Sequence, residues 1–218
     1  MRAKAVRLHG ENDLRLEDID LPAIGEDEIL ARVVSDSICM SSYKATIQGA
    51  RHKRVPENIA EKPVMIGHEL SGEILEVGSK WKNHFKTGQR FSIQPALNYK
   101  PLLDGMGAPG YSYQYIGGDA THIVIPNEVM ELGDLLPYEG PAFYLASLAE
   151  PVSCIVGTFH AMYHTEKYKY VHKMGIVPNG KMAILAGAGP MGIRALDYAL
   201  PNPDARPSLL VVTDIDQK

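Results

Sequence analysis

Residues 63–81 read PVMIGHELSGEILEVGSKW and place His68 beside Glu69, ahead of a run that alternates polar and aliphatic residues. Alternation with a period of two is typical of a half-buried strand and predicts a strand over residues 71–77. A helical zinc-protease motif is excluded, because it needs a second histidine one helical turn later and Gly72 occupies that position. His68 and Glu69 therefore lie where a loop enters a strand, either as part of another kind of metal site or as a polar pair without a ligand.

The first half of the chain contains short β-like segments separated by clusters of Gly, Pro, Asn and Asp. We expect strands over residues 3–8, 14–19, 28–34, 71–77, 90–94 and 121–126. A short helix is expected from Ser41, followed by a basic loop over residues 49–54, and a loop rich in Gly, Tyr and Pro spans residues 96–118. Short strands at this spacing predict an antiparallel barrel or sandwich.

The pattern changes near Glu139. Residues 141–164 have a helical pattern that Pro151 is expected to end or kink. A strand, a glycine-rich turn, a helix and a second strand then form one β-α-β unit, over residues 181–186, 190–200 and 208–213. We expect a β domain over residues 1–155 and an incomplete α/β domain over residues 156–218. Because one β-α-β unit cannot cover both faces of its parallel strands, we expect the chain to be the front part of a longer protein.

The composition is that of an ordinary soluble globular protein, with 45% hydrophobic and 22% charged residues. The net charge of −4 provides no basic field for nucleic acid. The sequence contains no apolar run long enough to predict a membrane span, and its N-terminus lacks the apolar core of a signal peptide. Cys39 and Cys154 are the two cysteines, so we expect no disulfide framework and a cytoplasmic location.

The glycine-rich turn satisfies G-x-G-x-x-G directly after the expected strand. Such glycines permit a tight turn, close approach of a pyrophosphate and close packing of helix on strand, while the helix N-terminus offers N–H groups to the phosphate. We expect cofactor binding through Gly187, Gly189, Pro190, Met191 and Gly192. Asp214 ends the next strand, where a carboxylate binds ribose hydroxyls and favours NAD. Arg206 and Lys218 are cations that leave NADP open.

Four residues in the chain suit a metal ion, namely Cys39, His68, Glu69 and Glu150. Thiolate, imidazole and carboxylate all bind Zn²⁺, and three protein ligands with one open position are the pattern of a catalytic zinc. Spacing alone leaves separate structural roles for these residues equally open.

The ordered motifs together resemble the zinc-dependent medium-chain dehydrogenases/reductases, which include alcohol, sorbitol and threonine dehydrogenases. The resemblance rests on Cys39, Gly67-His68-Glu69 with Gly72, Gly78, Gly88-Gln89-Arg90, Glu150-Pro151 and the glycine-rich turn. It covers essentially the whole chain. The stretches SDSICMSSYKATIQG, FSIQPALNYK, APGYSYQY, IPNEVMEL and PSLLVVTDIDQ are similar to family members that reduce a ketose phosphate.

This resemblance implies a mainly β, GroES-like barrel domain followed by the beginning of an α/β Rossmann domain. It implies hydride transfer between NAD or NADP and a sugar or polyol phosphate, with one catalytic zinc. Cys39 and His68 are implied as ligands, and the third is Glu69 or Glu150, with Glu69 preferred. No second, structural zinc is expected, because residues 96–118 contain no cysteine.

The resemblance also implies roles beside the metal. Ser41 matches the hydroxyl that relays a proton from the alcohol, and Lys44 stands where the family often has a histidine, as a terminal donor or a phosphate ligand. Arg51, Lys53 and Arg54 would lie near the substrate mouth, where cations suit a phosphate, although a solvated run of charges is as good an interpretation.

Three alternatives stay open at this point. The first is that the chain is another polyol or secondary-alcohol dehydrogenase of the family, and the second is that it is a non-catalytic zinc-binding fragment. The third is a metal-free relative, and the presence of the four candidate ligands argues against it. The expected partner is a small molecule, with no nucleic acid and no membrane, and the intact protein is expected to form a homo-oligomer. We expect this chain alone to be inactive or nearly so.

Overall fold

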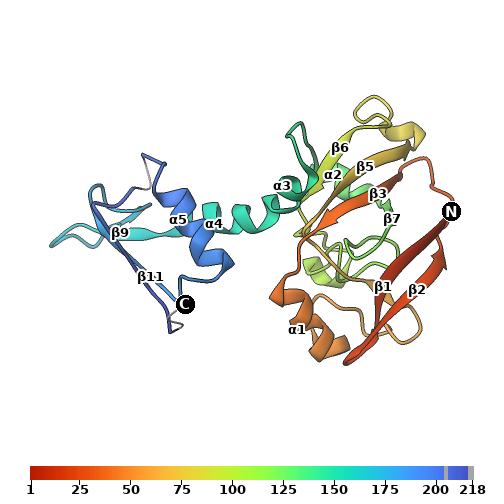
Figure 1. Ribbon diagram of the computed structural model, residues 1–218, viewed down its shortest axis with the longest axis horizontal. Helices are drawn as coiled ribbons and strands as arrows, with labels where there is room; N and C mark the ends of the chain where they lie inside the picture. Colours follow the sequence, from red (N-terminus) through yellow and green to blue (C-terminus); the bar gives the residue numbers. More distant parts are fainter. Residues whose placement is uncertain (204–205, 216–218) are drawn as a thin grey trace. The chain divides into compact units, whose positions relative to one another are not determined.

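The computed structural model describes residues 1–203 and 206–215, in two compact units (Figure 1). The first unit is Met1–Glu150 and the second is Pro151–Lys218. Lys218, which the sequence suggested for NADP binding, lies outside the described residues. Within the described part of the chain, no helix has the length and apolar character needed to cross a membrane.

The first unit is built on a five-stranded antiparallel sheet with the strand order β7-β3-β5-β6-β8. Its strands are β3 (Ile29–Asp36), β5 (Leu70–Val77), β6 (Arg90–Ile93), β7 (His122–Ile125) and β8 (Leu135–Pro137). The strands β3 and β5 lie side by side (Figure 1). They pair with Ile29 opposite Val77 at one end and Asp36 opposite Leu70 at the other. The chain that leaves β3 therefore lies next to the chain that enters β5.

A second antiparallel sheet has the order β2-β1-β4. Its strands are β1 (Arg2–Gly10), β2 (Asp13–Asp20) and β4 (Val64–Met65). The two sheets meet where Ala5 forms an isolated bridge with Ala120, next to a bond from the Val6 N–H to the Asp119 carbonyl of 2.8 Å. The predicted barrel or sandwich thus takes the form of two linked antiparallel sheets.

Aliphatic and aromatic side chains from both sheets form the main core. Ile74, Phe91 and Ile123 are each at most 1% exposed and belong to one cluster, and burial of each such side chain stabilises the fold by about 1.5–3 kcal/mol. A smaller cluster of buried residues includes Ala45 and Tyr111.

Short helices connect the strands of the first unit. They are α1 (Met40–Gln48), η1 (Gly49–Arg51), η2 (Ser79–Trp81), η3 (Leu103–Gly105), α2 (Asn127–Glu131) and α3 (Phe143–Ser147). The helix α1 ends at Gly49, whose φ of 51° lies in the left-handed region. A Cβ atom there would come within 2.7 Å of the Glu11 backbone nitrogen, so this turn requires glycine.

Trp81 is the single tryptophan of the chain and lies in the first unit. Its indole N–H donates to Asn127 Oδ1 at 3.1 Å, and Lys80 Nζ donates to the same oxygen at 2.8 Å. The indole packs against the main core cluster. These contacts fix η2 against α2.

The helix α4 (Ala149–Ala161) begins with the last two residues of the first unit and continues into the second. The second unit also contains β9 (Tyr163–Thr165), β10 (His172–Met174), β11 (Lys181–Leu185), α5 (Pro190–Ala199) and β12 (Leu209–Thr213). β9 and β10 form an antiparallel pair. β11 and β12 run parallel, with Leu185 opposite Thr213, as the β-α-β pattern predicted. Ile155, Phe159 and Ala199 form its small buried cluster.

The six strands predicted in the first half correspond to β1, β2, β3, β5, β6 and β7. The sequence analysis missed β4 and β8, which are only two and three residues long. It also missed the β9–β10 hairpin, whose strand residues are mostly exposed and therefore show no alternation. The helical pattern is interrupted near Pro151, as predicted: α3 ends and α4 begins on either side of Leu148. The break precedes Pro151, which lies in the first turn of α4, where its missing N–H has no helical partner to lose.

Candidate active site

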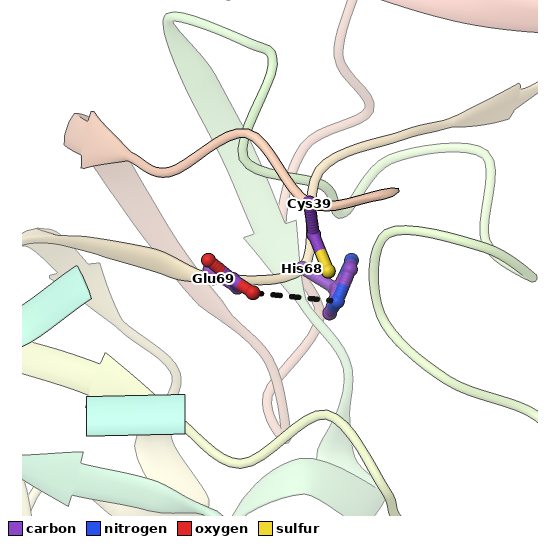
Figure 2. Close-up of side chains that lie close together, drawn as sticks. All are labelled: Cys39, His68 and Glu69. Atoms are coloured by element: carbon purple, nitrogen blue, oxygen red, sulfur yellow. Dashed lines mark ion pairs between the residues drawn. The ribbon is translucent and has the colours of Figure 1, made fainter. Parts of the chain in front are cut away.

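Cys39, His68 and Glu69 converge in the first unit (Figure 2). Cys39 follows β3 and caps the N-terminus of α1, and the other two residues directly precede β5. The antiparallel register of β3 and β5, with Asp36 opposite Leu70, brings these two segments together. One ligand atom from each of the three side chains lies within 4.8 Å of the others.

The cluster is buried, and burial sets its protonation. His68 is 4% exposed and Glu69 is 6% exposed. Burial lowers the pKa of His68 to about 4, so its imidazole is neutral and retains a lone pair at neutral pH. Burial also raises the pKa of the Cys39 thiol. A neutral imidazole, a thiol and a carboxylate in one buried place fit a zinc ion, which would favour the thiolate.

Two serines orient the candidate ligands. Ser42 Oγ lies 3.2 Å from His68 Nδ1, and Ser37 Oγ donates a hydrogen bond to Glu69 Oε2. A hydrogen bond on Nδ1 leaves Nε2 of the imidazole for a metal, which is how ligating histidines are usually held. The sequence analysis assigned no role to either serine, because hydroxyl residues around a helix start also serve as caps.

Ser41 and Tyr111 form a hydroxyl pair beside the cluster. Ser41 Oγ lies 2.9 Å from Cys39 Sγ and 3.2 Å from His68 Nε2. Tyr111 donates to Ser41 Oγ at 2.8 Å, and its ring centroid is 4.7 Å from that of His68. Burial raises the pKa of Tyr111 to about 12, so the phenol stays protonated. Tyr111 comes from the long irregular loop, within the stretch APGYSYQY, and the sequence analysis assigned it no role.

A cavity of about 220 Å³ opens beside these residues. Its lining comprises Ser41, Arg54, His68, Pro95, Ala96, Ala108, Tyr111 and Glu150. Among the described residues, the group of candidate ligand atoms contains Glu69 but not Glu150. The predicted ligands Cys39, His68 and Glu69 are thus brought together, while Glu150 faces the same cavity.

The structure separates the predicted basic residues. Lys44 is exposed on α1 and does not line the cavity. Arg51 pairs with Glu11 at 2.8 Å between Nη2 and Oε1, and both side chains are more than half exposed. Lys53 is exposed. Arg54 alone of the four lines the cavity.

The glycine-rich turn joins β11 to α5 in the second unit. Gly189 caps α5, with Pro190 as its first residue. A Cβ atom on Gly192 would overlap the backbone of Gly187, so the helix packs directly on the turn. Asp214 Oδ2 accepts a hydrogen bond of 2.8 Å from the Ala188 N–H. The turn and the carboxylate are therefore adjacent.

The chain matches known proteins over its whole length. It is 54% identical over 213 residues to the L-sorbose 1-phosphate reductase of Klebsiella pneumoniae, covering 98% of this chain and 51% of that protein. It is 51% identical over 208 residues to the mannitol-1-phosphate 5-dehydrogenase of Aliivibrio fischeri, covering 95% of this chain and 48% of that protein. The chain spans about half the length of the curated relatives it matches.

The fold is similar to that of solved dehydrogenases. The structure of 2R,3R-butanediol dehydrogenase from Bacillus subtilis has a TM-score of 0.71 at 20% sequence identity, covering 99% of this chain and 65% of that chain. Residues 25–134, about half of the chain, match the family model of the alcohol dehydrogenase GroES-like domain. The chain therefore belongs to the family of proteins that contain an alcohol dehydrogenase GroES-like domain.

Proposed function

We propose that the protein to which this chain belongs is a zinc-dependent oxidoreductase that transfers hydride between NAD or NADP and a sugar or polyol phosphate. The reaction is the interconversion of L-sorbose 1-phosphate and D-glucitol 6-phosphate. The observation that carries the proposal is the convergence of Cys39, His68 and Glu69 beside a cavity. The 54% identity to the Klebsiella reductase supports this choice of substrate.

The chain would hold one zinc ion through Cys39, His68 and Glu69, while Glu150 lines the adjacent cavity. When bound, zinc supplies a Lewis acid that polarises a carbonyl group and stabilises negative charge on its oxygen. Ser42 and Ser37 keep the imidazole and the carboxylate in place through their hydrogen bonds. The buried position of these side chains excludes water from the ligand cluster.

Ser41 would pass the proton to or from the substrate oxygen. Its Oγ lies at the cavity and accepts a hydrogen bond from Tyr111, which is protonated at neutral pH. In the direction of reduction, Ser41 donates its proton and Tyr111 is placed to support the resulting charge. Lys44 does not line the cavity and would enter this relay only at its outer end.

The second unit would begin a Rossmann domain. The parallel β11–β12 pair, the glycine turn and Asp214 support a nucleotide site made of Gly187, Gly189, Pro190, Met191 and Gly192. The carboxylate of Asp214 favours NAD. We assign residues 1–155 to the zinc-binding domain and residues 156–218 to the start of the nucleotide domain. A cytoplasmic location and a homo-oligomeric intact protein complete the proposal.

A polyol phosphate is a second candidate substrate. The chain is 51% identical to a relative named mannitol-1-phosphate 5-dehydrogenase, and this favours testing mannitol 1-phosphate beside L-sorbose 1-phosphate.

Metal content and turnover together test the proposal. One zinc per chain is expected in the wild type by mass spectrometry, and Cys39→Ser should abolish tight binding. Cys154→Ser removes the other, exposed thiol and is the matched control. The intact protein should reduce a ketose phosphate with a nicotinamide cofactor. A metal-free wild type of full length, or equal zinc loss in both serine variants, would refute the metal assignment.

A further inference from the structure

Arg54 differs from Arg51 and Lys53 of the same loop because its side chain lines the cavity and theirs are exposed at the surface. Arg51 is neutralised at the surface by Glu11, and Lys53 is exposed. Arg54 is half-buried and lines the cavity together with Ser41 and His68. Only one cation of this loop is therefore placed to meet a molecule bound at the candidate zinc site.

The backbone and side chain of Arg54 are both held in place. Its carbonyl accepts a hydrogen bond of 2.6 Å from Ser112 Oγ, and its N–H donates to His52 Nδ1 at 3.3 Å. The guanidinium Nη1 donates to the Met106 carbonyl at 3.1 Å. These contacts fix the direction of the side chain before any ligand binds.

The guanidinium retains hydrogen-bond donors for a ligand. A guanidinium carries five N–H donors, and the Met106 carbonyl engages one nitrogen. Partial burial of a cation costs free energy, which an anionic ligand would offset.

We propose that Arg54 binds the phosphate of the substrate, and that this phosphate is on the carbon next to the reacting carbonyl. This inference rests on the proposed function. The cavity of about 220 Å³ is smaller than the roughly 300–1,000 Å³ of pockets for drug-sized ligands. Because Ser41, His68 and Arg54 line this one cavity, we expect a carbonyl beside Ser41 and His68 and an anion on Arg54 to lie close together in one small molecule.

The names of the two relatives differ in how far the phosphate lies from the reacting carbon. The name L-sorbose 1-phosphate reductase places the phosphate on C1, next to the C2 carbonyl of a 2-ketose. The name mannitol-1-phosphate 5-dehydrogenase places the reacting carbon at C5 and the phosphate at C1. The position of Arg54 in the cavity favours the first arrangement for this chain, so a 1-phospho-2-ketose is the expected substrate class.

The test compares Arg54→Gln with Arg51→Gln in the intact protein. Hydrogen bonds to a charged group contribute about 1.5–3 kcal/mol, so kcat/KM for L-sorbose 1-phosphate should fall about 10- to 100-fold in Arg54→Gln. Most of the change should be in KM, and any reduction of unphosphorylated L-sorbose should fall by a much smaller factor than reduction of the 1-phosphate. Arg51→Gln should match wild type on both sugars, and Arg54→Lys should recover part of the phosphate preference. Unchanged zinc content in each variant shows that the site is folded.

Other outcomes would overturn the inference. Equal losses on L-sorbose and its 1-phosphate in Arg54→Gln would show that the residue does not recognise phosphate. A loss in Arg51→Gln as large as that in Arg54→Gln would show that phosphate recognition is not specific to Arg54. A preference of wild type for D-fructose 6-phosphate over L-sorbose 1-phosphate would overturn the placement of the phosphate next to the reacting carbonyl. A zinc-loaded wild type that reduces no ketose phosphate would instead refute the proposed function itself.

Discussion

The carboxyl groups of Asp36 and Asp119 interact in the interior of the first unit, close to Glu69. Burial, the charge of Asp119 and the charge of Glu69 raise the pKa of Asp36 to about 8. Burial also raises the pKa of Asp119. Within the described residues, the buried Oδ1 atom of Asp36 has no hydrogen-bond donor. A proton shared by the two carboxyls would supply that donor, so we infer that the pair carries one at neutral pH.

This pair makes stability depend on pH in an uncommon direction. Because the pKa of Asp36 is higher in the folded than in the unfolded chain, the fold favours the protonated acid, and this contribution is lost as pH rises from about 4 to 8. One pKa unit corresponds to about 1.4 kcal/mol, so the loss is at most about 5 kcal/mol. Asp36→Asn should remove most of it. Urea unfolding of the metal-free chain between pH 4 and pH 8 measures both variants, and parallel pH profiles would contradict the assignment.

The two candidate carboxylate ligands should differ in their effect on metal affinity. Glu69→Gln replaces the anionic carboxylate of the cluster with a neutral amide, whereas Glu150→Gln alters a side chain that lines the cavity outside the cluster. We expect Glu69→Gln to weaken zinc binding by more than the 10- to 100-fold typical of changes around a ligand, and Glu150→Gln to keep one zinc. Competition with a chelator gives both affinities. The reverse order would identify Glu150 as the third ligand.

Ser42 should influence metal affinity without touching the metal. Ser42→Ala removes the hydrogen bond to His68 Nδ1, so the imidazole loses its fixed orientation and zinc affinity should fall about 10- to 100-fold. Ser42→Thr keeps the hydroxyl and should restore most of the affinity. Thr46→Ala, one turn later on α1, removes a hydroxyl bonded only to the backbone carbonyl of Ser42 and serves as the control. Equal zinc affinity in Ser42→Ala and wild type would exclude the orienting role.

Two glycines of the turn should respond differently to alanine. A Cβ atom on Gly192 overlaps the Gly187 backbone, so Gly192→Ala should lower both the melting temperature and the affinity for NAD of the intact protein. A Cβ atom on Gly189 meets nothing within 4 Å, so Gly189→Ala should leave the melting temperature unchanged. It should nevertheless weaken NAD binding, because the second glycine allows a pyrophosphate to approach the backbone. Unchanged NAD affinity in both variants would mean that the turn does not bind the cofactor.

The sequence predicted the strands of the first unit because alternation reports burial on one face of a sheet. It singled out Cys39, His68 and Glu69 by chemical type, but their meeting depends on the register that sets Asp36 opposite Leu70, a long-range property that no local pattern contains. Tyr111 reaches the site from an irregular loop, where neither period nor propensity applies. Nothing in the sequence distinguishes Arg51 from Arg54. Only the fold places Arg51 beside Glu11 and Arg54 in the cavity lining.

The position of Trp81 gives the molecule a built-in optical reporter. As the single tryptophan, it lies in the first unit and is bonded to Asn127 across η2 and α2. Intrinsic emission excited at the red edge, where tyrosine does not absorb, therefore follows the unfolding of the first unit and is silent about the second unit. Comparison with far-ultraviolet circular dichroism, which senses both halves, would reveal whether they unfold together or one at a time.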